Sequence, residues 1–193
     1  MKREIVVARY LERQKWFEKY PEARVYSKNV DIPNWGRESS TYLHHIINNY
    51  DCLAEHTIFC QADPHDHSKK FEDEIKDYEY DFKEYGDWMV NSKGNGAPQH
   101  VGLKIDEKSL EIFGITLKEY GFVSGAQFVI SKSTLLERPK EFYEYLLKYC
   151  EEDEDAPWVL ERLWRQVFNA KDYPWVKKND YYITKEFIMG EHN

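Results

Sequence analysis

The segment Asp63–His67 (DPHDH) contains two carboxylates and two imidazoles within five positions. It directly follows the apolar segment Thr57–Gln61, whose β-branched and aromatic residues are typical of a buried strand. Mg²⁺ binds carboxylate oxygens together with substrate phosphates, and Mn²⁺ also accepts imidazole. We therefore predict that Asp63, assisted by Asp66 or His67, holds Mn²⁺ or Mg²⁺. In the alternative interpretation, Asp63 caps a short helix and the histidines are surface residues.

A zinc hydrolase is a competing explanation of the same segment. Metallo-β-lactamase-like proteins carry the spacing HxHxDH, which this segment does not reproduce, and the zinc motif HExxH is absent from the chain. The residues give a metal-dependent hydrolase no specific support, and it stays an alternative.

The turn Asn34–Glu38 (NWGRE) precedes apolar residues at helical spacing that continue to Tyr50, and Ser39 or Ser40 can cap that helix. The free N–H groups and partial positive charge at a helix N-terminus favour a phosphate, and Arg37 adds a charged donor. We therefore predict that Asn34, Gly36, Arg37 and Glu38 bind a nucleotide. The alternative is a structural turn with an Arg37–Glu38 charge pair.

Two further nucleotide-binding candidates, Arg9 and Tyr10, end the apolar segment Arg3–Tyr10. This segment predicts a central strand that is buried on both faces. In an open α/β sheet, ligands bind at the carboxyl ends of the strands, so these two side chains would face the ligand. The alternative for Arg9 is a surface charge.

These candidates require an α/β fold that brings strand ends together. The order strand, helix, strand at the start of the chain favours parallel pairing with a right-handed crossover. The expected strands are Arg3–Tyr10, Ala23–Ser27, Thr57–Gln61 and Ala126–Ser131. Helical patterns cover Leu11–Tyr20, the segment from Ser39 or Ser40 to Tyr50, Ser68–Glu84, Lys108–Tyr120 with a break at Gly114, the segment from Ser133 or Thr134 to Tyr149, and Trp158–Phe168. Gly86–Gly102 is an expected loop, either a lid over the site or a surface excursion, and Tyr173–Phe187 is expected to pack on the sheet without a chemical role.

Composition limits the class of protein. The chain of 193 residues is 41% hydrophobic and 32% charged, which is typical of one soluble globular domain. Its net charge of −8 argues against binding of nucleic acid through the phosphate backbone. The apolar runs are too short to span a membrane, the start of the chain lacks the apolar core of a secretion signal, and the three cysteines show no metal or disulfide spacing. A cytoplasmic protein with reduced cysteines is expected.

The order of these motifs resembles the nucleotide-binding half of GT-A glycosyltransferases, in which an apolar strand, an Asn-x-Gly turn before a helix and a strand ending in an acidic turn follow one another. The acidic turn in that fold usually reads Asp-x-Asp and holds a divalent ion on the donor diphosphate. The matching positions here are Gln61-Ala62-Asp63, so the first aspartate is replaced. This departure leaves open whether Asp63 binds the metal directly or the metal is dispensable.

The chain also resembles a family of unassigned function that includes an algal-virus-encoded glycosyltransferase domain. The shared pieces are VVARY, GRESSTYLHHIINNYD, TIFCQADPHDH, GAQFVISK and ERLW, which run in order over most of the chain. The resemblance implies a single GT-A-like domain with a mixed, mostly parallel sheet flanked by helices. Its nucleotide-binding part would be residues 1–67 and its acceptor-side part residues 100–193.

The resemblance further implies a transferase that moves a sugar from a nucleotide diphosphate donor, expected to be a UDP-sugar, to a carbohydrate hydroxyl. Glu161 would be the general base, with Asp155 as the reserve candidate, and a base opposite the leaving nucleotide implies inversion. Sugar or acceptor contacts would come from Ser124, Gly125 and Gln127. In the structural alternative Glu161 pairs with Arg165 four residues later. A catalytically silent nucleotide-sugar or carbohydrate-binding module is the alternative function.

Overall fold

The computed structural model describes residues 2–91, 102–117 and 119–169, and its centre is a sheet of five strands in the order β2-β1-β3-β7-β4. β1 pairs in parallel with β2 and β3, whereas β7 is antiparallel to β3 and β4. Four strands therefore run in one direction and β7 in the other. The strands are β1 (Arg3–Arg9), β2 (Ala23–Ser27), β3 (His56–Gln61), β4 (Phe82–Glu84) and β7 (Phe128–Ser131). The predicted mixed α/β sheet is confirmed.

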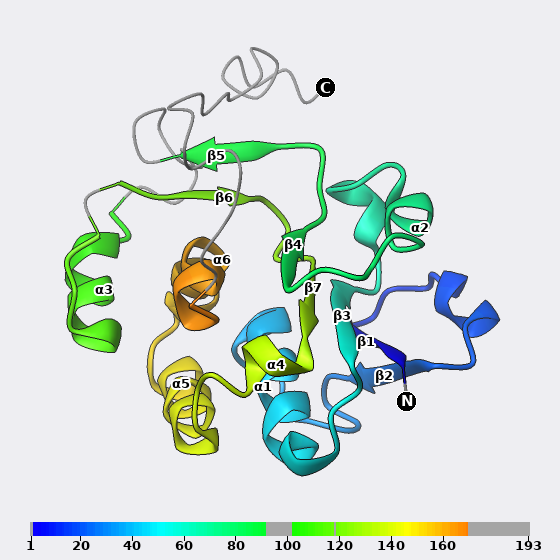
Figure 1. Ribbon diagram of the computed structural model, residues 1–193, viewed down its shortest axis with the longest axis horizontal. Coiled ribbons are helices and arrows are strands. Elements are labelled where there is room, and N and C mark those ends of the chain that lie inside the picture. The colour runs from blue at the N-terminus through cyan, green and yellow to red at the C-terminus, as the bar shows by residue number, and fades with distance from the viewer. Residues whose placement is uncertain (1, 92–101, 118, 170–193) are drawn as a thin grey trace.

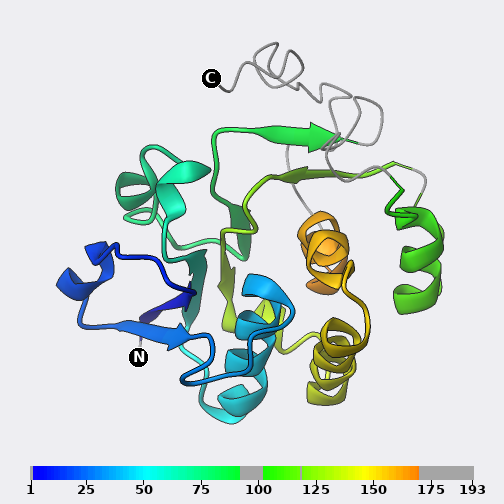
Figure 2. The ribbon, with the colours of Figure 1, turned by 180° about the vertical axis from the view of Figure 1, so that it is seen from behind.

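The two central strands are buried on both faces because their apolar runs are continuous. Ile5–Val7 and Ile58–Cys60 have no exposed surface, and alternate side chains point to opposite faces of the sheet. Val6 and Phe59 contact the core under the helices α1 (Arg37–Asn48), α5 (Lys140–Glu152) and α6 (Ala156–Val167). Figure 1 shows these helices on one side of the sheet, and Figure 2 shows the same arrangement from behind.

The opposite face of the sheet is covered by shorter elements. The 3-10 helix η1 (Trp16–Lys19) and the helix α2 (Phe71–Glu74) pack on Ile5, Val7 and Cys60. Further short helices are η2 (Tyr50–Cys52), η3 (Pro64–Asp66) and α4 (Lys132–Leu135).

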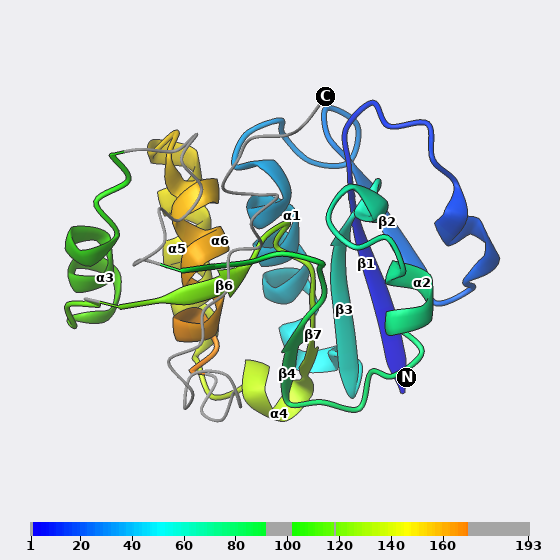
Figure 3. The same ribbon diagram turned by 90° about the horizontal axis from the view of Figure 1, so that it is seen from above.

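A second, two-stranded sheet extends from the first. It consists of β5 (Met89–Asn91) and β6 (Gly121–Val123), which are antiparallel, and it reaches past α6 toward α3 (Ile105–Phe113) (Figure 3). Sequence patterns did not predict this ribbon, because each of its strands has only three residues.

Several element predictions are wrong for identifiable reasons. Leu11–Tyr20 contains only η1, because Leu11 adopts a left-handed backbone (φ 61°) that ends the strand in a turn rather than opening a helix. The predicted helix Ser68–Glu84 contains α2 and then β4, because Phe82 and Glu84 pair with β7. The predicted helix through Tyr149 is two helices, since Pro139 separates α4 from α5.

Some expectations fall outside the described residues. These are Tyr173–Phe187 and most of Gly86–Gly102, of which residues 92–101 are not described. Within the part of the chain that the structure describes, no helix has both the length and the apolar character needed to cross a bilayer.

Candidate functional site

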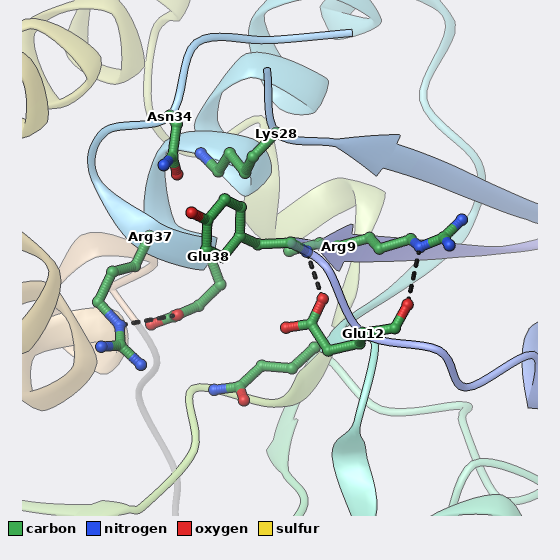
Figure 4. Close-up of a pocket in the computed structure, with 9 residues that line it drawn as sticks. Arg9, Glu12, Lys28, Asn34, Arg37 and Glu38 are labelled. Carbon is green, nitrogen blue, oxygen red and sulfur yellow. Dashed lines mark hydrogen bonds and ion pairs between the residues drawn. The ribbon is translucent and has the colours of Figure 1, made fainter. Parts of the chain in front are cut away.

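A cavity of about 280 Å³ lies where β1, β2 and β3 end, at the carboxyl edge of the parallel strands. We call it the strand-end cavity (Figure 4). It is lined by Ala8, Arg9, Tyr10, Glu12, Lys28, Asn34, Arg37, Glu38 and Gln61. The structure thus brings together five of the six residues predicted to bind a nucleotide. The sixth, Gly36, lies in the same turn, next to Arg37.

Gly36 directly precedes α1 and determines the path of the backbone beside this cavity. Its backbone is left-handed (φ 65°), and a Cβ atom there would lie 2.7 Å from the Ser40 Cβ and 3.0 Å from the Cys150 Cβ. Only glycine can adopt this backbone without strain and also avoid this crowding, because it has no Cβ atom. The helix begins at Arg37, so the predicted serine cap is wrong: Ser40 lies inside the first turn, and its hydroxyl donates to the Trp35 carbonyl (2.6 Å).

Lys28 supplies a buried cation to the cavity. Its side chain donates to the Trp35 carbonyl (3.0 Å) and to the Ser40 Oγ (2.5 Å), and only 7% of the residue is exposed. Burial lowers the pKa of Lys28 to about 8, although the neighbouring Glu38 opposes this shift. Sequence reasoning missed Lys28. The available signal was its position directly after the predicted strand Ala23–Ser27, at the same sheet edge as Arg9.

Arg37 and Glu38, which are predicted to bind a nucleotide, contact each other as the structural interpretation of their turn expects. The Arg37 Nε lies 3.6 Å from the Glu38 Oε2, so the charge pair is present. The Arg37 guanidinium also lies over the Trp158 ring of α6, with its carbon 5.6 Å from the centroid. Burial raises the pKa of the Glu38 carboxyl; Arg37 opposes the shift and Glu161 adds to it. Glu38 and Glu161 therefore interact electrostatically.

The turn after β1 forms another wall. The Arg9 Nε donates to the Glu12 carbonyl (3.2 Å), and the Glu12 carboxylate accepts the Tyr10 backbone N–H. In Figure 4 the Arg9 guanidinium extends away from Arg37 and Asn34. Tyr10 is 45% exposed, so its ring is available to a ligand. Leu11 in this turn is left-handed, as is Arg37 in the opposite wall; bulky residues adopt this backbone rarely, and such residues gather at functional sites.

The predicted metal ligands Asp63, Asp66 and His67 are not among the residues that line the strand-end cavity. The Asp63 carboxylate accepts a hydrogen bond from the Gln14 amide, and Asp66 is exposed. The His67 ring packs edge-on against Trp88, with centroids 5.9 Å apart. Among the residues that the structure describes, no three His, Cys, Asp or Glu side chains are placed to share one metal ion.

Gly125 links the end of β3 to α6. Its N–H donates to the Glu161 Oε1 (2.7 Å), and its carbonyl accepts from the Gln61 Nε2 (3.0 Å). The backbone is left-handed (φ 103°), and a Cβ atom would lie 2.6 Å from the His67 Cβ. The candidate base Glu161 is thereby connected to a residue that lines the cavity.

The other two sugar-contact candidates, Ser124 and Gln127, form hydrogen bonds to backbone carbonyls. The Ser124 N–H donates to the Trp88 carbonyl (3.0 Å), and the Gln127 Nε2 donates to the Pro64 carbonyl (3.1 Å). The Ser124 Oγ and Gln127 Oε1 atoms are buried and have no hydrogen-bond partner within the described parts of the chain.

The two candidate bases are placed differently. The Glu161 side chain is 16% exposed and lies 3.5 Å from the Arg162 Nη1, while Arg165, its alternative partner, donates two hydrogen bonds to Glu84. Asp155 lies at the N-terminus of α6, where its N–H donates to the Asp153 Oδ1 (2.9 Å). Glu161 follows Asp155 by six residue steps, which correspond to about 9 Å along the helix axis.

A family model described as "Protein of unknown function (DUF3431)" matches residues 5–85 of the chain. No curated protein and no solved structure gives a significant match. The matched range contains every residue that lines the strand-end cavity and ends before Gly125 and Glu161.

Proposed function

We propose that this protein is a glycosyltransferase with a GT-A-like domain that transfers a sugar from a nucleotide diphosphate donor, most simply a UDP-sugar, to a carbohydrate hydroxyl. The observation that carries the proposal is the strand-end cavity: a buried lysine, an arginine and a helix N-terminus meet at the carboxyl ends of parallel strands. Mixed strand directions and the Gln61-Ala62-Asp63 turn after β3 agree with a GT-A-like fold.

The donor diphosphate would lie between Lys28, Arg37 and the first turn of α1. Lysine and arginine both form charge-assisted hydrogen bonds with phosphate oxygens, and the unpaired N–H groups of the helix add to them. Arg9 would contribute further positive charge, and the exposed ring of Tyr10 suits stacking on the nucleotide base. Asn34 and Glu38 would complete the nucleotide contacts.

Asp63, assisted by Asp66 or His67, is the proposed holder of Mn²⁺ or Mg²⁺. Mg²⁺ is commonly held by one or two carboxylates plus substrate phosphates, so a three-residue protein site is not required. The 29% exposed side chain of Asp63 and its position two residues after the cavity residue Gln61 fit that role. When bound, the ion would neutralise charge on the leaving diphosphate.

Glu161 is the proposed general base. The acceptor hydroxyl oxygen forms a bond to the anomeric carbon while the bond from that carbon to the diphosphate oxygen breaks. The hydroxyl proton passes to the Glu161 carboxylate, and the electron pair leaves with the diphosphate. Attack opposite the leaving group inverts the anomeric centre. The hydrogen bond from Gly125 holds the Oε1 atom and so fixes the orientation of the carboxylate. Ser124, Gly125 and Gln127 would contact the sugar or acceptor.

A nucleotide-sugar panel tests this function. Calorimetry of the full chain with UDP-sugars and Mn²⁺ should detect binding, and free nucleotide should appear faster when a carbohydrate acceptor is present. Binding without turnover would identify a binding module, and acceptor-independent release would identify a hydrolase. Failure of every nucleotide sugar to bind would refute the proposal.

A further inference from the structure

A second cavity, of about 360 Å³, lies next to His65 of the segment Asp63–His67, on the side of the sheet opposite α1. We call it the lysine cavity. It is lined by Lys19, Tyr20, His65, Lys69, Lys70, Glu72, Asp73 and Lys76. None of these residues lines the strand-end cavity, so the inference below does not depend on the proposed transfer reaction.

Two elements that are far apart in sequence hold the lysine cavity in shape. Trp16 of η1 packs edge-on against Phe71 of α2, with centroids 5.4 Å apart, and its Nε1 donates to the Ala62 carbonyl (2.9 Å). The Tyr20 hydroxyl reaches the Glu72 carboxylate at 3.4 Å. Phe71 is fully buried, so the wall that carries Lys69 and Lys70 is anchored in the core.

The charges of the cavity do not cancel. Lys19 pairs with Glu72, and Lys76 pairs with Asp73 at 2.7 Å. Lys69 and Lys70 form no ion pair with any residue that the structure describes. Four lysines against two carboxylates leave an excess of two positive charges on a chain whose net charge is −8.

We propose that the lysine cavity binds a phosphate-bearing ligand. Ammonium groups that converge on a concave surface attract a compact dianion and donate hydrogen bonds to its oxygens. The volume of the cavity matches the lower end of the range for small-molecule sites. The phosphate could belong to a soluble metabolite or to a lipid headgroup, because both present the same group to the lysines.

The test follows the amide and indole N–H resonances of the full chain by NMR during titration with inorganic pyrophosphate. The expected result is a saturable shift of the Lys69 and Lys70 amides and of the Trp16 indole. This response should persist in Lys28→Met, which removes the buried cation of the strand-end cavity. The double variant Lys69→Glu/Lys70→Glu should bind at least about tenfold more weakly.

Lys140→Glu/Lys148→Glu is the matched control, because it makes the same change in net charge on α5, on the other face of the sheet. It should bind pyrophosphate like the unaltered chain. The inference is overturned if the three signals do not shift, or if both double variants weaken binding equally, which would indicate only general attraction between charges.

Sedimentation with phosphatidylcholine vesicles, with and without phosphatidic acid, separates the two sources of phosphate. Pyrophosphate binding together with retention by the phosphatidic acid vesicles supports the site with a lipid headgroup as its ligand. Pyrophosphate binding without retention supports the site with a soluble ligand.

Discussion

At the scale of single residues, Lys28 is buried although its side chain carries a charge when protonated. A lysine that is buried and has a lowered pKa destabilises the native state, because its charged form is disfavoured there. Its ammonium nevertheless lies at a cavity with two arginines and a helix N-terminus. The proposed role in anion binding would offset this cost in stability, because a bound phosphate favours the charged form of the side chain.

Replacing Lys28 by methionine is expected to raise the free energy of unfolding at pH 7 by about 1–3 kcal/mol while it abolishes donor binding. The native pKa of about 8 lies below the unfolded value of 10.5, so the unfolded chain binds more protons between these values. The stability of the unaltered chain should therefore rise with pH from 8 to 10.5, and its difference from Lys28→Met should shrink. Urea denaturation across that range measures both effects, and a constant difference would contradict the assignment.

Replacing Asp63 by alanine is expected to abolish donor turnover while the protein stays folded, because the proposed metal contact is lost and its only described side-chain hydrogen bond is to Gln14. Turnover with Mn²⁺ and circular dichroism measure the two properties. Gln14→Ala is the control, since it removes the same hydrogen bond and keeps the carboxylate. Undiminished activity of Asp63→Ala would remove the metal assignment.

Replacing Glu161 by glutamine is expected to lower kcat by about 10²–10⁴-fold and to leave donor affinity unchanged. The amide oxygen of glutamine can still accept the Gly125 N–H, so the local structure is retained. Steady-state kinetics and donor calorimetry separate the two quantities. Asp155→Asn should be nearly fully active. If Asp155→Asn is inactive and Glu161→Gln is active, Asp155 rather than Glu161 is the general base.

At the scale of elements, the turns around the strand-end cavity depend on backbone that only a few residues tolerate. Gly36 and Gly114 provide a comparison, because both have left-handed backbone at a helix end, with φ of 65° and 70°. A Cβ atom at Gly36 would be crowded by Ser40 and Cys150, whereas none of the described atoms lies within 4 Å of one at Gly114.

Gly36→Ala should therefore destabilise the protein by about 2–4 kcal/mol, from the left-handed backbone and from overpacking, whereas Gly114→Ala should cost only about 1 kcal/mol. Only Gly36→Ala should also weaken donor binding. Thermal unfolding and calorimetry of the two variants check this expectation. Equal losses would show that crowding at the start of α1 is unimportant.

The sequence predicted those elements whose apolar residues follow a pattern that is visible within the segment itself. β2 has the predicted bounds, β1 and β3 differ by one residue at one end, and the cavity residues Arg9, Asn34 and Arg37 follow from strand ends and helix starts. β4, β5 and β6 were missed, because three-residue strands are determined by their pairing partners rather than by periodicity. Lys28 was missed for a similar reason, since its burial arises from the fold of the following turn.

At the scale of the whole molecule, one buried ion pair connects the two sheets to the helical layer. Arg165 of α6 donates two hydrogen bonds, of 2.9 and 2.8 Å, to Glu84 of β4, and the same carboxylate accepts the Val123 N–H of β6 at 3.3 Å. Burial raises the pKa of Glu84, and Arg165 opposes that shift.

Glu84→Ala is expected to cost about 3–5 kcal/mol, because it leaves the Arg165 charge buried without this partner. The double variant Glu84→Leu/Arg165→Met should cost less, since it leaves no unpaired charge at this position. Guanidinium denaturation measures both values. A larger loss of stability in the double variant than in Glu84→Ala would show that the ion pair stabilises the protein more than apolar side chains at these positions do.

The two backbone hydrogen bonds of Gly125 have a consequence for exchanging the segment that the family model matches. One polar atom of that residue contacts Gln61, inside the segment matched by the family model, and the other contacts Glu161, well beyond it. We therefore expect a chimaera that exchanges residues 5–85 to keep this link between β3 and α6 only when the imported segment carries a side chain that can donate a hydrogen bond to the Gly125 carbonyl.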